Sequence, residues 1–236
     1  MSVLTHDEHT TGGHHESPEV IDHRQRLGIW IFIAGDVVTL AALLFTYLYL
    51  RGTNTEGSWR SVVAFDFTGK SLAQAQNLID NGTPGRVFEK AVSLGLNWAI
   101  VLVVAVSAAL FAFGERKIRE GNARTLVPVG LAASAVAIVA AVLAVIQMRS
   151  IPQFYFVQND SQLFIHTAYG SAMLALSGAL IIHLVLLAFL GVGIVVRSLN
   201  GAISSTKWTQ VRLVRFFWVW VAISTLITAV VTTALQ

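Results

Sequence analysis

One acidic residue lies inside a long apolar stretch near the start of the chain. Residues 27–51 read LGIWIFIAGDVVTLAALLFTYLYLR, and Asp36 is the only acid among them. An aspartate at the centre of a bilayer costs about 2.5–3.5 kcal/mol on insertion scales, so it is expected to be protonated, paired, or turned towards protein or an internal cavity. Asp36 therefore marks either a pathway for protons, lipid or gas, or a hydrogen bond to a neighbouring helix. Both interpretations stay open at this point.

His183 is the second polar residue with a candidate role inside an apolar stretch. It shares the stretch 165–196 with His166. A helix rises about 1.5 Å per residue, so the two imidazoles would lie about 25 Å apart and could not bind one metal ion. A haem held by this chain alone would need two histidines at similar depth on different helices, and no such pair is present. We expect His183 to form a hydrogen bond to another helix, with Asp36 as a candidate partner.

The elements that must position these residues are membrane spans. Hydrophobic residues make up 55% of the 236 residues and charged residues 12%, and the mean hydropathy is +0.66. An apolar stretch of about 20 residues is long enough to cross the hydrocarbon core as a helix. The sequence therefore predicts an all-α, polytopic membrane protein whose five transmembrane helices form a bundle. The predicted spans are residues 27–50, 92–113, 126–147, 165–196 and 213–234.

The distribution of basic residues predicts the orientation of the bundle. With five spans, the N-terminus and the second and fourth connections share one side of the membrane, and cytoplasmic loops are enriched in Lys and Arg. We therefore expect a cytoplasmic N-terminus. Ten basic residues lie on that side, Arg24, Arg26, Arg116, Lys117, Arg119, Arg124, Arg197, Lys207, Arg212 and Arg215, and six on the other, Arg51, Arg60, Lys70, Arg86, Lys90 and Arg149.

Two segments are expected to lie outside the membrane. Residues 1–26 are polar and rich in histidine, which predicts a flexible cytoplasmic tail rather than a signal peptide or a metal site. The connection 52–91 contains a short helix candidate, SLAQAQNLID at residues 71–80, followed by the turn signal NGTPG.

Composition and motifs exclude several functions. The chain has no cysteine, which rules out disulfides, thiolate metal sites and c-type haem attachment. The net charge of +3 is not a sign of nucleic-acid binding, because the basic residues sit in loops between apolar spans. No phosphate-binding loop, HExxH or GxSxG motif occurs. We expect a non-catalytic subunit of an enzyme complex, with no active site of its own.

Other residues are expected to serve the packing of the helices. Asn97 is predicted to bond a neighbouring backbone, and Gln147 to be an interfacial anchor. Phe216, Phe217, Trp218 and Trp220 are expected to form an aromatic belt at the cytoplasmic interface. Two stripes of small residues predict close helix contacts. They are Ala133, Ala137 and Ala141 in the third span and Ser171, Ala175 and Ala179 in the fourth.

The first span also carries a family resemblance. The run GIWIFIAGD from Gly28 to Asp36, followed by Phe45, Tyr47 and Tyr49 up to Arg51, resembles the signature helix of subunit III of haem-copper cytochrome c and quinol oxidases. The resemblance covers most of residues 24–234, in the layout of the shorter, five-helix bacterial members. Further agreement, in order along the chain, comes from Asn97, Gly121-Asn122 with Arg124, Gln147, Ser177-Gly178 and the Trp-rich start of the last span.

The chain departs from the family pattern at several positions, which indicates a divergent member. The family's Ser-Glu pair in the first span is Gly35-Asp36, and its His-Gly-x-His falls on residues 171–174, SAML. Its Gln-x-x-Glu ends in Ser150, and the Trp-His of its last helix is Trp218-Val219.

The resemblance implies a role in aerobic respiration and electron transport. Such a subunit holds no haem or copper itself; these cofactors belong to partner subunits. It would contact the catalytic subunit I and other respiratory subunits in the bacterial inner membrane, stabilise subunit I, bind structural phospholipid, and assist oxygen or proton access. The candidate residues for lipid contact or a proton or oxygen pathway are Asp36, Trp30, Arg51 and His183.

Two other functions remain open. An accessory subunit of a nitric oxide reductase would share the same pattern. A small transporter or channel is the other alternative, and such proteins commonly show internal repeats or helices broken at mid-membrane.

Overall fold

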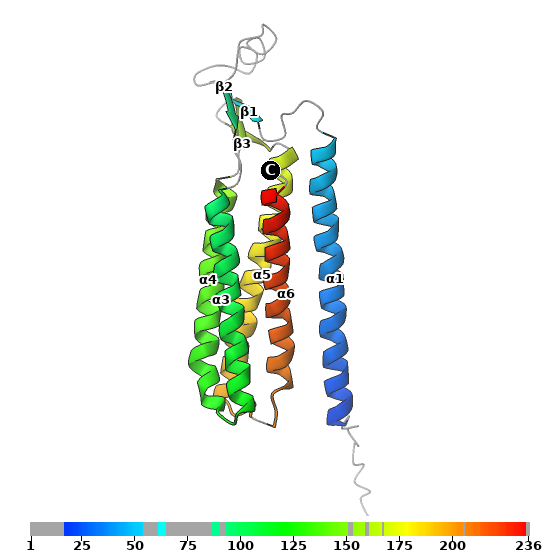
Figure 1. Ribbon diagram of the computed structural model, residues 1–236, viewed down its shortest axis with the longest axis vertical. Helices are drawn as coiled ribbons and strands as arrows, with labels where there is room; N and C mark the ends of the chain where they lie inside the picture. Colours follow the sequence, from blue (N-terminus) through cyan, green and yellow to red (C-terminus); the bar gives the residue numbers. More distant parts are fainter. Residues whose placement is uncertain are drawn as a thin grey trace, which may run out of the picture.

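The computed structural model describes residues 17–53, 61–64, 86–89, 93–150, 153–158, 161–166, 168–204 and 206–234. Within them, five helices are long and apolar enough to span a membrane, as predicted. They stand side by side in one bundle (Figure 1). The helices are α1 (Pro18–Gly52), α3 (Leu94–Arg119), α4 (Leu126–Arg149), α5 (Ala168–Leu199) and α6 (Thr209–Ala234), and a 3-10 turn, η1 (Ala123–Thr125), precedes α4.

The ends of the helices follow local sequence signals. Pro18 opens α1, where a missing backbone N–H costs no helical hydrogen bond. Ser93 caps α3 by accepting a hydrogen bond from the backbone N–H of Leu96. Gly121 ends the same helix with a φ of 88°, a conformation that glycine adopts without steric cost.

Most helices extend a few residues beyond the predicted spans, and at two places the structure assigns residues to another element than predicted. The sequence predicts a tail up to residue 26, but α1 begins at Pro18, so residues 18–26 are helical. The prediction of His166 in the fourth span is wrong, because His166 ends strand β4 and α5 begins only at Ala168. The rest of the proposed tail, residues 1–16, and the helix candidate at 71–80 lie outside the described residues.

Two short hairpins lie at the end of the bundle that holds the C-terminus (Figure 1). Strands β1 (Ser61–Ala64) and β2 (Arg86–Glu89) pair antiparallel, with Ser61 opposite Glu89. Strands β3 (Gln153–Gln158) and β4 (Ser161–His166) pair antiparallel, with Gln153 opposite His166. Neither hairpin was predicted.

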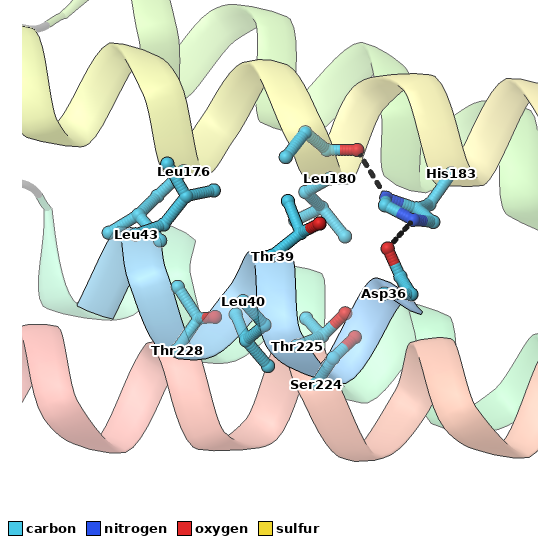
Figure 2. A pocket seen from close by; sticks show the side chains of 11 residues that line it. Asp36, Thr39, Leu40, Leu43, Leu176, Leu180, His183, Ser224, Thr225 and Thr228 are labelled. Atoms are coloured by element: carbon cyan, nitrogen blue, oxygen red, sulfur yellow. Dashed lines mark hydrogen bonds and ion pairs between the residues drawn. The ribbon is translucent and has the colours of Figure 1, made fainter. Parts of the chain in front are cut away.

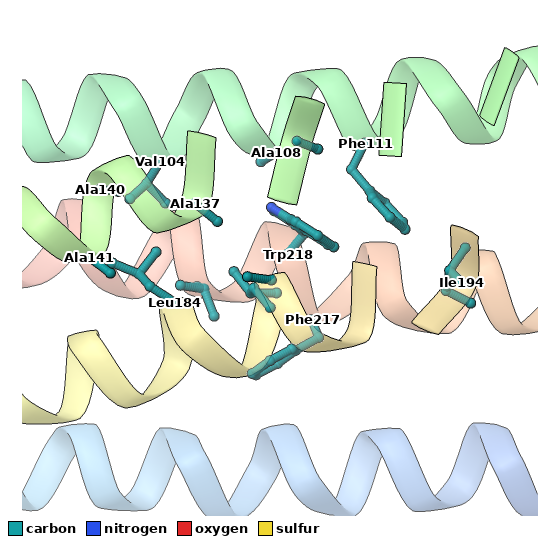
Figure 3. Close-up of a cluster of buried hydrophobic side chains, with 14 of the residues drawn as sticks. Val104, Ala108, Phe111, Ala137, Ala140, Ala141, Leu184, Ile194, Phe217 and Trp218 are labelled. Carbon is teal, nitrogen blue, oxygen red and sulfur yellow. The ribbon is translucent and has the colours of Figure 1, made fainter. Parts of the chain in front are cut away.

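The main core is shared by α3, α4, α5 and α6 (Figure 3). Ala133, Ala137 and Ala141 of α4 are buried, so the first small-residue stripe is confirmed. The second stripe is wrong, since Ser171 and Ala175 are exposed. The small residue of α5 that permits close approach is Gly191, where a Cβ atom would overlap Ser134 Oγ and lie 2.7 Å from the Trp218 ring.

The expected aromatic belt is wrong for two of its four members. Phe217 is 1% exposed and Trp218 is fully buried. The Trp218 ring stacks on Phe111 with centroids 4.2 Å apart, and its indole N–H donates to Ser107 Oγ at 2.8 Å. Full burial of the ring and a hydrogen-bond partner inside the bundle place Trp218 in the packed core rather than at the lipid interface.

Helix α1 lies at the side of the bundle and packs on α5 and α6 (Figure 1). Near the C-terminal end of α1, a second buried cluster joins it to α5 through Tyr47, which is fully buried, and Tyr169, Ala172, Met173 and Leu176. At mid-length, the contact between α1 and its neighbours includes Asp36.

Candidate functional site

Asp36 and His183 meet near the middle of the bundle, as the sequence suggested. Asp36 lies close to the midpoint of α1, and His183 close to the midpoint of α5. The Asp36 Oδ1 and His183 Nε2 atoms are 2.8 Å apart (Figure 2). Their side chains are 14% and 21% exposed, respectively. The two ionisable groups are therefore paired across two helices. An unpaired ionisable side chain inside a membrane span would carry a large free-energy cost.

Trp220 of α6 completes the site. Its indole N–H donates a hydrogen bond to Asp36 Oδ2. An indole N–H can only donate, so Oδ2 acts as an acceptor. The carboxyl group thus binds α5 through one oxygen and α6 through the other.

The hydrogen bonds of His183 define how many protons the pair holds. His183 Nδ1 lies 2.6 Å from the Ala179 backbone oxygen, which can only accept, so Nδ1 carries a proton. The contact between Nε2 and Oδ1 then needs one more proton. That proton resides on Nε2, giving imidazolium and carboxylate, or on Oδ1, giving neutral imidazole and carboxylic acid. In both forms the pair is electrically neutral overall, which suits its depth.

A cavity of about 40 Å³ adjoins the pair between α1, α5 and α6. Asp36 and His183 lie at one end of it in Figure 2, and Thr228 lies towards the other. Polar and apolar side chains share the lining. Its residues are Asp36, Thr39, Leu40, Leu43, Leu176, Ala179, Leu180, His183, Ser224, Thr225 and Thr228.

The other two candidate residues do not join this site. Trp30 lies six residues before Asp36, is 55% exposed, and contacts the Phe216 ring with centroids 5.7 Å apart. Arg51 lies in the last turn of α1, about 22 Å of helical rise from Asp36. The structure thus brings together Asp36 and His183 but neither Trp30 nor Arg51.

A second buried acid, Glu115, was missed from the sequence. Helix α3 continues beyond the predicted span end at residue 113, and Glu115 is 2% exposed. Its Oε2 atom forms an ion pair with Arg215 Nε of α6 at 2.6 Å. The Arg215 guanidinium also lies 5.3 Å from the centre of the Phe216 ring. The available signal was the continuous helical pattern through residue 119, with Glu115 on the same face as the core residues Phe111 and Ile118.

A third polar cluster lies at the C-terminal end of the bundle. Asn97 Nδ2 donates to Thr232 Oγ1 at 3.2 Å, and Gln147 Nε2 donates to Asn97 Oδ1 at 3.3 Å. The interhelical bond expected for Asn97 is therefore present, but its partners are side chains rather than a backbone. Gln147 is 3% exposed, so its assignment as an interfacial anchor is wrong.

No protein-family model matches this chain, and the curated proteins contain no significant relative of it.

Proposed function

We propose that this chain is the non-catalytic subunit III of a terminal haem-copper oxidase in a bacterial inner membrane, with its N-terminus in the cytoplasm. The observation that carries the proposal is the carboxyl of Asp36, in the GIWIFIAGD helix, held near the middle of the bundle against α5 and α6. This position corresponds to the buried carboxylate that the resemblance implies. The bundle itself supports a multi-pass membrane protein.

The proposed work of the subunit is to stabilise the catalytic subunit I, bind phospholipid, and assist oxygen or proton access. An apolar cavity of about 410 Å³ between α1, α5 and α6 supports the lipid part of this role, since it is large enough for part of an acyl chain. It lies on the N-terminal side of Asp36 and is lined by Gln25, Gly28, Ile29, Phe32, Leu190, Ile194, Gln210, Leu213, Val214 and Phe217. Haem and copper would be held by partner subunits.

Purification of the chain with its native partners in mild detergent tests the proposal. An optical redox difference spectrum and mass spectrometry of the purified complex are the measurements. Co-purification of haem-copper oxidase subunits supports the proposal. Co-purification of nitric oxide reductase subunits would instead favour an accessory subunit of that enzyme. Isolation of the chain alone and free of haem would overturn both and favour a small transporter or channel.

The Asp36→Asn variant tests the role of the carboxyl group within such a complex. We expect the variant complex to assemble normally, because asparagine can keep both hydrogen bonds of Asp36. We also expect the lifetime of activity during prolonged turnover to change, because the titratable proton is lost. The measurement is the decay of oxygen consumption during continuous turnover. Identical decay in the variant and the natural protein would contradict the role of the proton.

A further inference from the structure

The cavity beside Asp36 extends in one direction only along the bundle. From Asp36 and His183 it passes Leu40 and reaches Leu43, Leu176 and Thr228, all of which lie closer to the C-terminal end of the bundle (Figure 2). A cavity needs about 10–15 Å³ for each water molecule and polar partners to hold it. At about 40 Å³, with two ionisable groups and four hydroxyls in its lining, this cavity has room for about three waters.

Hydroxyl groups continue the polar path along α6. Ser224, Thr228 and Thr232 recur every four residues after Trp220, so they form one winding stripe on the helix. Each of Ser224 and Thr232 donates its own proton to a backbone carbonyl within α6 and keeps its oxygen as an acceptor. Thr232 uses that oxygen to bind Asn97 in the polar cluster at the C-terminal end.

The opposite side of the pair is apolar. The Phe217 ring lies against His183, with centroids 6.0 Å apart, and Phe32 meets Phe217 edge-on at 5.2 Å. Beyond these rings lies a largely apolar groove of about 410 Å³, whose two polar lining residues, Gln25 and Gln210, lie nearer the N-terminal ends of α1 and α6 than the pair does. A proton reaching Asp36 from the N-terminal side would meet no polar group among the lining residues near the pair.

We propose that this cavity and the hydroxyl stripe of α6 form a hydrated half-channel that exchanges protons between the Asp36–His183 pair and the C-terminal end of the bundle. The shared proton leaves to a cavity water, and the pair becomes aspartate and neutral imidazole with a net charge of −1. A proton from the C-terminal side restores the neutral pair, so no electron moves. The Trp220 N–H stabilises the transient carboxylate at Oδ2. Among the residues that line the cavity, Asp36 and His183 are the titratable ones.

Cysteine labelling tests which side the cavity opens to, and the chain has no native cysteine to interfere. The Thr228→Cys variant would be treated in sealed vesicles, on one side at a time, with Ag⁺, a thiol-reactive ion small enough for a cavity that holds about three waters. Labelling is read as protection of the thiol from a maleimide added after denaturation. A thiol reacts as thiolate, which requires water. We expect labelling from the C-terminal side only. The control is Ile227→Cys, the neighbouring position on α6, which is 39% exposed, does not line the cavity and should stay unlabelled. Labelling of Thr228→Cys from both sides, or from neither, would overturn the half-channel.

Hydrogen–deuterium exchange of the pair provides a second measurement on the intact chain. The infrared band of the Asp36 carboxyl is assigned by its loss in Asp36→Asn, and its exchange in D₂O is then timed. The Thr228→Val variant removes one relay group, and losing a hydrogen bond worth about 1.4 kcal/mol slows exchange about tenfold. The matched control is Thr46→Val, whose exposed hydroxyl on α1 bonds its own backbone. Equal rates in both variants would count against the relay.

The half-channel and the proposed function fail separately. One-sided labelling in a chain that isolates without haem subunits would keep the half-channel and remove the oxidase role. Co-purification with haem-copper subunits but no labelling at residue 228 would keep the oxidase role and remove the half-channel.

Discussion

Asp36 joins three helices through its hydrogen bonds, in addition to carrying an exchangeable proton. One of its oxygens contacts α5 through His183, and the other accepts from α6 through Trp220. Side-chain hydrogen bonds between membrane helices contribute about 0.6 kcal/mol on average and up to about 1.7 kcal/mol. These two bonds therefore contribute to holding α1, whose outward face includes the exposed side chains of Ile31, Val38 and Phe45, against the rest of the bundle.

Two substitutions separate the hydrogen bonds of Asp36 from its proton. In Asp36→Asn the amide donates to His183 Nε2 and its oxygen accepts from Trp220, so stability should change little. In Asp36→Leu both partners lose their bonds, and we expect a loss of about 1–3 kcal/mol. The measurement is unfolding of the purified chain in detergent. Equal destabilisation by the two variants would show that the carboxylate charge, not the bonding, stabilises the contact.

The buried ion pair between Glu115 and Arg215 gives a second prediction at this scale. Removing the partner of a buried charge costs about 3–5 kcal/mol, and because Arg215 is 32% exposed we expect the lower end for Arg215→Met. Adding Glu115→Gln removes the unpaired charge and should restore most of the stability. The measurement is unfolding of both variants in detergent.

The ion pair of Arg116 with Glu120 supplies the control for that experiment. It lies at the exposed end of α3, where Lys117 and Arg116 hold the pKa of Glu120 below its ordinary value. The contribution of this pair to stability is complete above the ordinary pKa of a glutamate and is lost as the pH falls through the lowered pKa. At neutral pH, Arg116→Met should change stability far less than Arg215→Met. A double variant at residues 115 and 215 that is no more stable than Arg215→Met alone would contradict the ion-pair account.

The sequence revealed some of these site residues and not others, for physical reasons. Asp36 and His183 can be predicted from the sequence, because an ionisable residue in an apolar span needs a partner. Trp220 cannot be predicted as a site residue, because the acceptor of its indole N–H depends on the rotation of α1 and α6 about their own axes, which the sequence does not give. Glu115 was hidden by the basic residues Arg116 and Lys117 that follow it, which resemble the start of a cytoplasmic loop.

At the scale of elements, the packing of α5 depends on one glycine. Gly191 faces Ser134 of α4 and Trp218 of α6, and a methyl group there would collide with both. Trp218 in turn is held by its hydrogen bond to Ser107 of α3. Four helices therefore meet around this position.

The Gly191→Ala variant should loosen that junction. Overpacking a well-packed core costs about 1–3 kcal/mol, which outweighs the gain in helix propensity from alanine. Gly193→Ala is the matched control, because a Cβ atom there meets no atom within 4 Å, and it should leave stability unchanged or slightly raised. Thermal unfolding in detergent measures both. Equal stability of the two variants would show that the junction can relax around the methyl group.

Hydropathy predicted the number and order of the membrane helices but not the strands beside them. The predicted fourth span began at residue 165, inside strand β4, because Phe164 and Ile165 are as apolar as the residues of the helix that follows. A short apolar run does not distinguish strand from helix by periodicity alone. Pairing of β4 with β3, a contact between separate segments, determines the conformation there.

At the scale of the whole molecule, the two ends of the bundle differ in charge. The end that holds the start of α1 gathers the basic residues of α3 and α6, and several lie over aromatic rings. Arg119 and Arg212 flank Trp208 at 5.4 and 5.8 Å, and Lys117 lies 5.5 Å from the Phe113 ring. Cations stacked on rings at a membrane interface suit contact with anionic lipid headgroups, which are enriched on the cytoplasmic leaflet.

This asymmetry predicts the orientation of the chain, which single cysteines can measure. Asn122 lies in the turn between α3 and α4 at the basic end, and Thr53 caps α1 at the opposite end. In intact cells, a membrane-impermeant maleimide should label Thr53→Cys and leave Asn122→Cys unlabelled until the membrane is opened, because basic connections stay in the cytoplasm. If only Asn122→Cys were labelled in intact cells, the basic end would lie outside, and the predicted orientation would be wrong. The half-channel would then open towards the cytoplasm, and protons would reach Asp36 from that side.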